Sequence, residues 1–135
     1  MVKQEIISLS TKNRCQWIDI SPNVQKVIDN CGIKNGICSV ISLHTTAAIT
    51  VNENADPDVE TDFFKKLAQL IPQREPFYRH AEGNSDSHLK ASLVGLSTLV
   101  PVTNGSLVLG TWQSIYFCEF DGPRNRHVSV SIIGE

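Results

Sequence analysis

The sequence lacks any apolar run near the roughly 20 residues that a membrane-spanning helix requires. Residues 1–5 carry one basic side chain but are not followed by the apolar core of a secretory signal peptide. Lysine and arginine never exceed two in a row, and the formal net charge is −2, so the basic face typical of nucleic-acid or anionic-membrane binding is not indicated. We therefore expect a cytoplasmic protein with neither membrane nor nucleic acid as a partner.

Several catalytic and redox motifs are also missing. The chain has no G-x-S-x-G nucleophile elbow and no glycine-rich phosphate loop, which disfavours acyl transfer and nucleotide hydrolysis. Its four cysteines form no C-x-x-C pair, and without a secretion signal we expect them to be reduced and mostly buried. They are Cys15, Cys31, Cys38 and Cys118.

The composition is that of one folded domain. The 135 residues include 41% hydrophobic and 19% charged side chains, both ordinary for a globular chain. A chain of this length buries about two-thirds of its unfolded surface, so it needs no disulfide to hold it together. We expect a single domain over residues 1–135.

Most of the chain has the pattern of β-strands. Alternating or β-branched segments are typical of half-buried strands, and Asn104-Gly105 between apolar runs predicts a tight hairpin. Because strands dominate and helices are inserted between them, we expect an α+β fold built mainly on antiparallel sheet. The predicted strands are residues 4–9, 16–20, 36–43, 46–51, 98–102, 107–109, 112–120 and 126–133.

Three helices are predicted from caps and periodicity. Ser21-Pro22 offers a helix N-cap followed by proline, and Gly32 can close that helix in the left-handed conformation. Asp56-Pro57 repeats the start signal, ahead of an apolar stripe that ends before Pro72. The third helix, over 86–97, has one apolar face. The stripe comprises Val59, Phe63, Leu67, Leu70 and Ile71, and the apolar face Leu89, Leu93 and Leu96.

The histidines are the candidates for chemistry. His44 ends a predicted strand, His80 lies in the long 72–85 loop, and His88 falls in the first turn of the third helix. Three neutral imidazoles can hold a divalent ion and leave a fourth position open. Spacing alone does not show whether these histidines bind a metal or are ordinary surface or core residues. For His127, an ordinary surface or core role is favoured. Carboxylates that could orient the rings are Glu53, Asp56, Glu82 and Asp86.

The acidic series around the second helix has a structural explanation. Asp58 and Glu60 fall in the first turn, where carboxylates interact favourably with the helix dipole. Glu53 precedes the cap residue Asp56, so an interaction with the helix dipole does not explain a carboxylate at this position.

Four segments together resemble the YjbQ family, a group often described as secondary thiamine-phosphate synthases. The similarity keeps order and spacing over nearly the whole chain. The segments are LHTTAA (43–48), NENADP (52–57), YRHAEG (78–83) running into DSHLKASL (86–93), and Gly105 followed by LGTWQ (109–113) and CEFDGPR (118–124). Where some members carry a histidine after the position of Glu119, this chain has Phe120, so no role of that imidazole carries over.

This resemblance implies a jelly-roll-like β sandwich of the α+β class that assembles as a homotrimer, and we expect a small-molecule substrate. It also implies a pocket that holds the histidines, with a divalent metal, zinc by type, on His44, His80 and His88. The family's motif positions include Asp56, Trp112, Gln113 and Glu119, and also the four residues that we place in a catalytic set: Glu53, Asp86, Lys90 and Arg124.

The implied activity joins a hydroxymethylpyrimidine diphosphate to a thiazole phosphate and releases diphosphate. A metal, Lys90 and Arg124 would stabilise the departing diphosphate, with Glu53 or a histidine as base. Diphosphate sites usually recruit Mg²⁺ through carboxylates, whereas three imidazoles favour a transition metal. We therefore expect a metal-binding enzyme for a small phosphorylated molecule, with this synthase activity secondary. A trimer that binds metal or ligand without turnover, and histidines with a purely structural role, are the alternatives.

Overall fold

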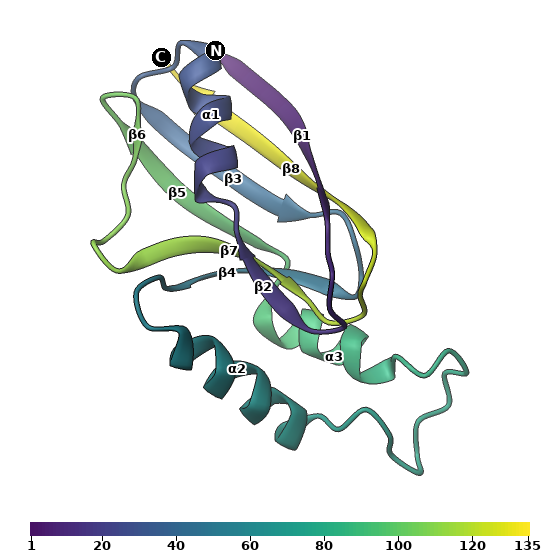
Figure 1. Ribbon diagram of the computed structural model, residues 1–135. Helices are drawn as coiled ribbons and strands as arrows, with labels where there is room; N and C mark the ends of the chain where they lie inside the picture. The colour runs from purple at the N-terminus through teal and green to yellow at the C-terminus, as the bar shows by residue number, and fades with distance from the viewer.

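The computed structural model describes residues 1–135, which form two antiparallel sheets and three helices (Figure 1). The larger sheet has the strand order β1-β8-β3-β5-β6 and the smaller one β2-β7-β4. This arrangement confirms the expected antiparallel α+β class. The strands are β1 (Val2–Ser10), β2 (Gln16–Asp19), β3 (Gly36–Ser42), β4 (Ala47–Glu53), β5 (Ser97–Thr103), β6 (Ser106–Leu107), β7 (Gln113–Glu119) and β8 (Asn125–Gly134).

The helices α1 (Ser21–Cys31), α2 (Pro57–Leu70) and α3 (Ser85–Val94) lie close to their predicted ranges. Gly32 ends α1 at φ 76°, in the left-handed region, and the Asp56 side chain caps α2 by accepting from the amide of Asp58. The Ser21 cap is wrong: Ser21 is the first helical residue, and its hydroxyl accepts instead from the amide of Ile115 in β7.

The main core lies on the inner face of the larger sheet. Val40 of β3 and Val130 of β8, which pair across the sheet, are fully buried there. One part of this face is covered by α1 through Val24 and Ile28, and another by Phe117 of the smaller sheet. Figure 1 shows α1 running across the larger sheet at the end where both chain termini meet.

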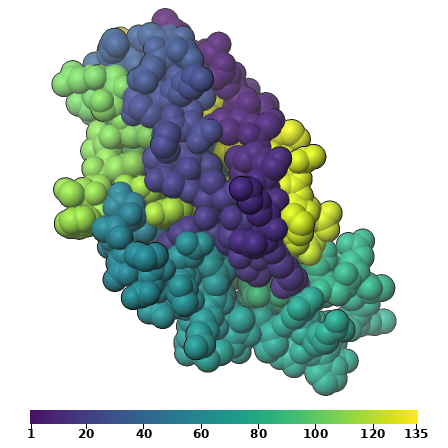
Figure 2. Space-filling model, viewed as in Figure 1, coloured from purple at the N-terminus to yellow at the C-terminus, as the bar shows by residue number.

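A second apolar cluster lies on the opposite face of the smaller sheet. The Trp17 ring stacks on Tyr116, with centroids 4.3 Å apart, and Phe63 of α2 packs against the same indole. Of the predicted α2 stripe only Leu67 is fully buried, and Leu70 is exposed. In the space-filling view α2 and the loop after it form the end of the molecule opposite the termini (Figure 2).

Helix α3 buries its polar side, contrary to the simplest expectation from its leucines. Leu89 and Leu93 are 48% and 64% exposed, whereas Asp86 is fully buried and Lys90 nearly so. The reason is an ion pair between Asp86 and Lys90 that packs this face against the smaller sheet.

No helix of the chain is both long and apolar enough to cross a bilayer.

Candidate functional site: a polar cavity between three segments

A cavity of about 320 Å³ opens where residues 44–46, the start of α3 and the β7–β8 turn meet. No hydrophobic side chain lines it. Such a surface solvates charge and hydrogen-bonding groups rather than apolar ones. Its lining residues are His44, Thr45, Thr46, Glu82, Asn84, His88, Asp121, Arg124, Asn125 and Arg126.

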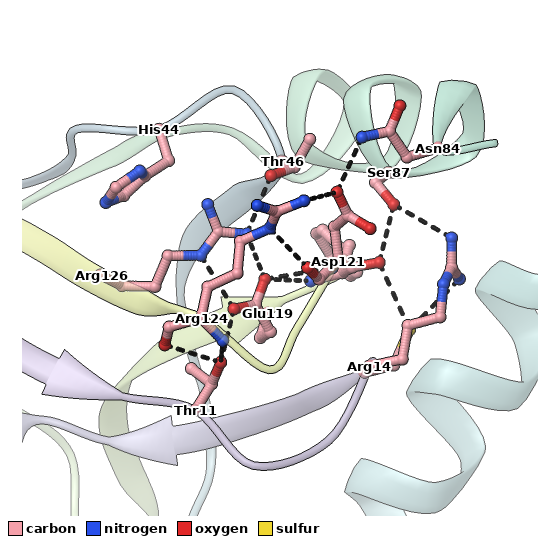
Figure 3. Close-up of polar contacts among 12 residues, drawn as sticks. Thr11, Arg14, His44, Thr46, Asn84, Ser87, Glu119, Asp121, Arg124 and Arg126 are labelled. Carbon is pink, nitrogen blue, oxygen red and sulfur yellow. Dashed lines mark hydrogen bonds and ion pairs between the residues drawn. The ribbon is translucent and has the colours of Figure 1, made fainter. Parts of the chain in front are cut away.

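The floor of this polar cavity is a buried ion pair between Glu119 of β7 and Arg126 of β8. Arg126 donates from Nε and Nη2 to the two carboxylate oxygens, and Nη2 also donates to the Thr46 hydroxyl at 2.8 Å. The remaining nitrogen, Nη1, has no partner in the chain, and Figure 3 shows it on the side of His44. The ion pair between these two strands, which belong to different sheets, therefore holds a guanidinium in place with one free donor at the cavity.

Glu119 organises the segments around that floor. Its carboxylate also accepts from the Thr11 hydroxyl at 2.7 Å and from the backbone amides of Phe120 and Asp121. Burial opposes ionisation of Glu119, but the hydrogen bonds from Arg126, Thr11 and Asp121 outweigh it and lower its pKa below the usual value. The carboxylate thus stays charged and orders the turn between β7 and β8.

Arg124 forms one wall of the cavity and is half-exposed. Its guanidinium donates to the backbone oxygen of Asp121 at 2.8 Å and to its carboxylate at 3.0 Å. The same carboxylate accepts from Asn84 Nδ2 at 2.7 Å, which ties the turn to the start of α3 (Figure 3). Asn84 Oδ1 is the one buried side-chain oxygen or nitrogen without a partner.

His44 lies beside Arg126, and its ring has a defined hydrogen-bonding state. The backbone N–H of His127 donates to His44 Nε2 at 2.8 Å. The neutral ring therefore carries its proton on Nδ1. Burial, followed by the charge of Arg126, lowers the pKa of His44, which favours this neutral form.

His80 and His88 form a second pair. Their ring centroids are 5.3 Å apart and their planes perpendicular. His88 lines the polar cavity and, with His80, also a neighbouring 490 Å³ pocket that contains Phe77, Tyr78 and Leu89. The structure thus brings His88 beside His80 and into the same cavity as His44, but no group of three or more His, Cys, Asp or Glu side chains is arranged to hold a metal ion.

Two of the predicted catalytic residues, Asp86 and Lys90, lie outside the cavity lining. Asp86 accepts from Lys90 at 2.9 Å and from Arg14 at 3.0 Å, and both α3 residues are buried. Burial opposes ionisation of Asp86, but the bonds from Arg14 and Lys90 lower its pKa overall. This triad anchors α3 to the segment before β2.

Glu53 is also separate from the histidines. It lies at the end of β4 and lines a different pocket with Trp17, Asp56 and Glu60. Its carboxylate accepts from the amide of Ala55 at 2.9 Å and so stabilises the turn into α2. Of the four predicted catalytic residues, only Arg124 lines the polar cavity.

The residues that the sequence reasoning missed are Arg126, Asn84 and the central position of Glu119. An arginine inside the apolar alternation of β8, at a position whose neighbours Val128 and Val130 face the core, was the available signal. A charged side chain on a core-facing register needs a buried counter-charge. The sequence did not reveal that Glu119 supplies it.

The protein is thus an antiparallel α+β protein with a polar cavity beside the turn between β7 and β8. A family model described as "UPF0047 protein YjbQ-like" matches residues 5–135, and the chain belongs to that family. Among curated relatives, the UPF0047 protein YugU of Bacillus subtilis is 45% identical over 95% of this chain and 97% of that protein. UPF0047 protein MJ1081 of Methanocaldococcus jannaschii is 47% identical over 94% and 91%.

Solved structures agree with this assignment. A YjbQ/UPF0047 protein from Clostridium acetobutylicum is 51% identical, with a TM-score of 0.93 over 96% of this chain and 99% of that one. A protein from Sulfolobus solfataricus, described as YbjQ-like and of unknown function, is 36% identical with a TM-score of 0.95 over 100% and 99%. The resemblance seen in the sequence motifs is therefore confirmed, and it defines a family whose function is not established.

Proposed function

We propose that the protein is an enzyme that binds a small phosphorylated molecule in the polar cavity and acts on it with a divalent transition metal, zinc by type. The observation that carries the proposal is the Arg126 guanidinium, which is 3% exposed yet has Nη1 free at the cavity floor. A buried guanidinium held by three other hydrogen bonds is a preorganised donor for a phosphate oxygen.

Further donors surround the same space. Arg124 retains an unpaired Nη1, and neutral His44 carries its proton on Nδ1, so both can donate to an anion. Together these groups favour a ligand with several oxygen atoms, as a phosphate ester has.

For the metal, the chemistry of the donor set favours His80 and His88. Two imidazoles that share a tetrahedral zinc have ring centroids about 5 Å apart, close to the 5.3 Å separation here. His44 fits less well because its Nε2 already accepts a backbone hydrogen bond. When bound, such a metal supplies Lewis acidity and lowers the pKa of a coordinated water.

Within this proposal Arg124 and Arg126 hold the phosphate group, and Glu82, which also lines the cavity, accepts a proton. The thiamine-phosphate synthase reaction is a secondary activity of the same site. In it the arginines would stabilise the departing diphosphate.

Binding is tested by calorimetry with inorganic phosphate. We expect Arg124→Gln to weaken phosphate binding about tenfold, since a charge-assisted hydrogen bond is lost. Arg74→Gln is the matched control, because Arg74 is an exposed arginine of the 72–85 loop outside the cavity lining. Equal affinities of the two variants, or no phosphate binding by the wild type, would refute the phosphate site.

A binding protein without turnover is the alternative, and one observation favours it. Glu53, Asp86 and Lys90 are engaged elsewhere, which leaves few catalytic groups at the cavity. The zinc-loaded protein is incubated with the pyrimidine diphosphate and the thiazole phosphate, and also with 4-nitrophenyl phosphate. Product that is lost in Arg124→Gln supports the enzyme, whereas tight phosphate binding with no product supports the binding protein.

We also propose the homotrimer that the family resemblance implies. Its support is the outer face of the larger sheet, where Ile37, Leu99 and Ile133 are 54%, 68% and 62% exposed on adjacent strands. In sedimentation analysis Leu99→Asp should reduce the trimer mass to that of the monomer. Leu70→Asp, on the exposed side of α2, is the control and should leave the mass unchanged.

A further inference from the structure

The 490 Å³ pocket next to the polar cavity differs from it in chemistry. His88 lines both spaces, so the two are neighbours. The polar cavity has no hydrophobic lining residue, whereas Phe77, Tyr78 and Leu89 line this second space, which we call the aromatic pocket. Both volumes fall within the roughly 300–1,000 Å³ that is typical of small-molecule sites. Together the two spaces offer one charged half and one apolar half.

The rings of the aromatic pocket stand perpendicular to one another. Phe77 and Tyr78 have centroids 5.1 Å apart with an angle of 81° between their planes. His80 and His88 have centroids 5.3 Å apart at 90°. Because an aromatic ring has a negative face and a positive edge, edge-to-face and offset contacts are the favoured ones. Walls that present both edges and faces therefore suit a further aromatic ring.

The loop that carries these rings is held by its own hydrogen bonds. The Tyr78 hydroxyl donates to the carbonyl of Pro72 at 2.9 Å, which fixes the ring at its far end. Gln73 Nε2 donates to the carbonyl of Gly83 at 3.2 Å and so joins the two ends of the loop. The wall formed by Tyr78 is thus in place before a ligand binds, which lowers the entropy cost of binding.

Two hydrophobic side chains of the aromatic pocket are left in contact with water. Phe77 is 72% exposed and Leu89 is 48% exposed. The polar lining residues are Arg79, Ser85 and the two histidines, and no carboxylate or carboxamide side chain is among them. Covering such a surface with hydrocarbon is favourable, whereas hydroxyl and amino groups of a ligand would find few partners there.

We propose that the aromatic pocket binds the organic group of the phosphorylated ligand, and that this group is an apolar aromatic ring. The inference rests on the proposed function, because the phosphate of the same molecule would occupy the polar cavity. The ligand is then an aryl or arylmethyl phosphate monoester rather than a sugar phosphate, a nucleotide or the phosphate of a polar heterocycle. Phe77 and Leu89 are the residues that set this specificity.

The test is calorimetry with phenyl phosphate, glycerol phosphate and inorganic phosphate. The two esters share the same charged group, so the ratio of their affinities measures the contribution of the organic group. We expect the wild type to bind phenyl phosphate roughly tenfold more tightly than glycerol phosphate, because the ring covers apolar surface. Phe77→Ser and Leu89→Ser should each reduce this ratio severalfold and leave the affinity for inorganic phosphate unchanged. Leu93→Ser is the matched control, since this leucine of the same helix is 64% exposed and lies outside the pocket.

The outcomes separate this inference from the phosphate site. Equal affinities for the two esters in a wild type that still binds inorganic phosphate would overturn the aromatic pocket and leave the phosphate site standing. A preference for phenyl phosphate that persists in both Phe77→Ser and Leu89→Ser would show that the ring binds elsewhere. If the wild type binds none of the three phosphates, the proposed function fails and the inference fails with it. Circular dichroism of each variant verifies that its fold is intact.

Discussion

Two buried carboxylates in this protein are each paired with a cationic side chain, but their surroundings differ. Asp86 is held by Arg14 and Lys90 beneath α3, whereas Glu119 is held by Arg126 and Thr11 beneath the polar cavity. Both carboxylates are fully buried. The Asp86 cluster lies outside the polar cavity, whereas the Glu119 cluster leaves one guanidinium nitrogen facing it.

The difference teaches that burial of an ion pair does not by itself mark a functional site. A paired and fully bonded cluster joins elements of the fold, and its net contribution to stability is small or even unfavourable relative to an apolar core. A cluster that keeps one donor free at a polar cavity can bind a ligand. The four predictions that follow separate these two roles.

The largest effect is expected for Asp86→Ala. It leaves Lys90 buried without its counter-charge and removes the partner of Arg14. Breaking a buried pair in this way costs about 3–5 kcal/mol of unfolding free energy. Urea denaturation measures the loss, and phosphate affinity of the folded protein should be unchanged. A fall in affinity without a change in stability would assign Asp86 to the site instead.

A smaller loss, about 1.5–3 kcal/mol, is expected for Glu119→Gln, because the amide still accepts one hydrogen bond from Arg126. Phosphate binding should strengthen by roughly fivefold, since the counter-charge beneath the cavity is removed and about 1 kcal/mol of opposing Coulomb energy goes with it. Calorimetry on the folded variant shows whether its phosphate affinity rises or falls. Weaker binding would mean that Glu119 acts chiefly by holding Arg126 in place.

The two clusters also predict how stability depends on pH. Both carboxyls have folded-state pKa values below their unfolded values. Their stabilisation is therefore complete above the unfolded carboxyl pKa of about 4 and is lost as the pH falls through the lower folded-state pKa. Urea midpoints across this acidic range should fall steeply for the wild type. Asp86→Asn, already destabilised at neutral pH, should show a shallower fall.

The smallest effect is expected for Leu93→Lys. This leucine is 64% exposed on α3, so a charged side chain there should change the unfolding free energy by no more than about 0.5 kcal/mol. Thermal denaturation of this variant beside Lys90→Met compares the two faces of the helix directly. A large loss in Leu93→Lys would show that the leucine face is covered in solution.

Much of the fold was predictable because it follows from local patterns. The Asp56 cap, the left-handed Gly32 and the Asn104-Gly105 turn all satisfy backbone requirements within a few residues. The alternating pattern over residues 36–43 likewise predicted a strand, and the structure buries its Cys38, Val40 and Ser42 face. The prediction for α3 was wrong, because its buried Asp86 pairs with Lys90 on the same helix and with Arg14, which is far away in the chain.

The candidate site, too, was predicted only in part from the sequence. The motifs indicated that His44, His80, His88 and Arg124 matter, and the structure places three of them at the polar cavity and His80 beside His88. They did not indicate that Glu119 and Arg126 form its floor.

Residue pattern alone thus determined the antiparallel α+β class, the end of α1 at Gly32, the Asp56 cap of α2 and the family. Only the tertiary structure decided which charged groups meet, and therefore that Asp86 and Lys90 are sealed beneath α3 while Arg126 faces a cavity. The physical reason is that hydrophobic periodicity and capping act between neighbours in the chain. The pairing of a buried charge depends on strands and loops that the sequence separates and the fold brings together.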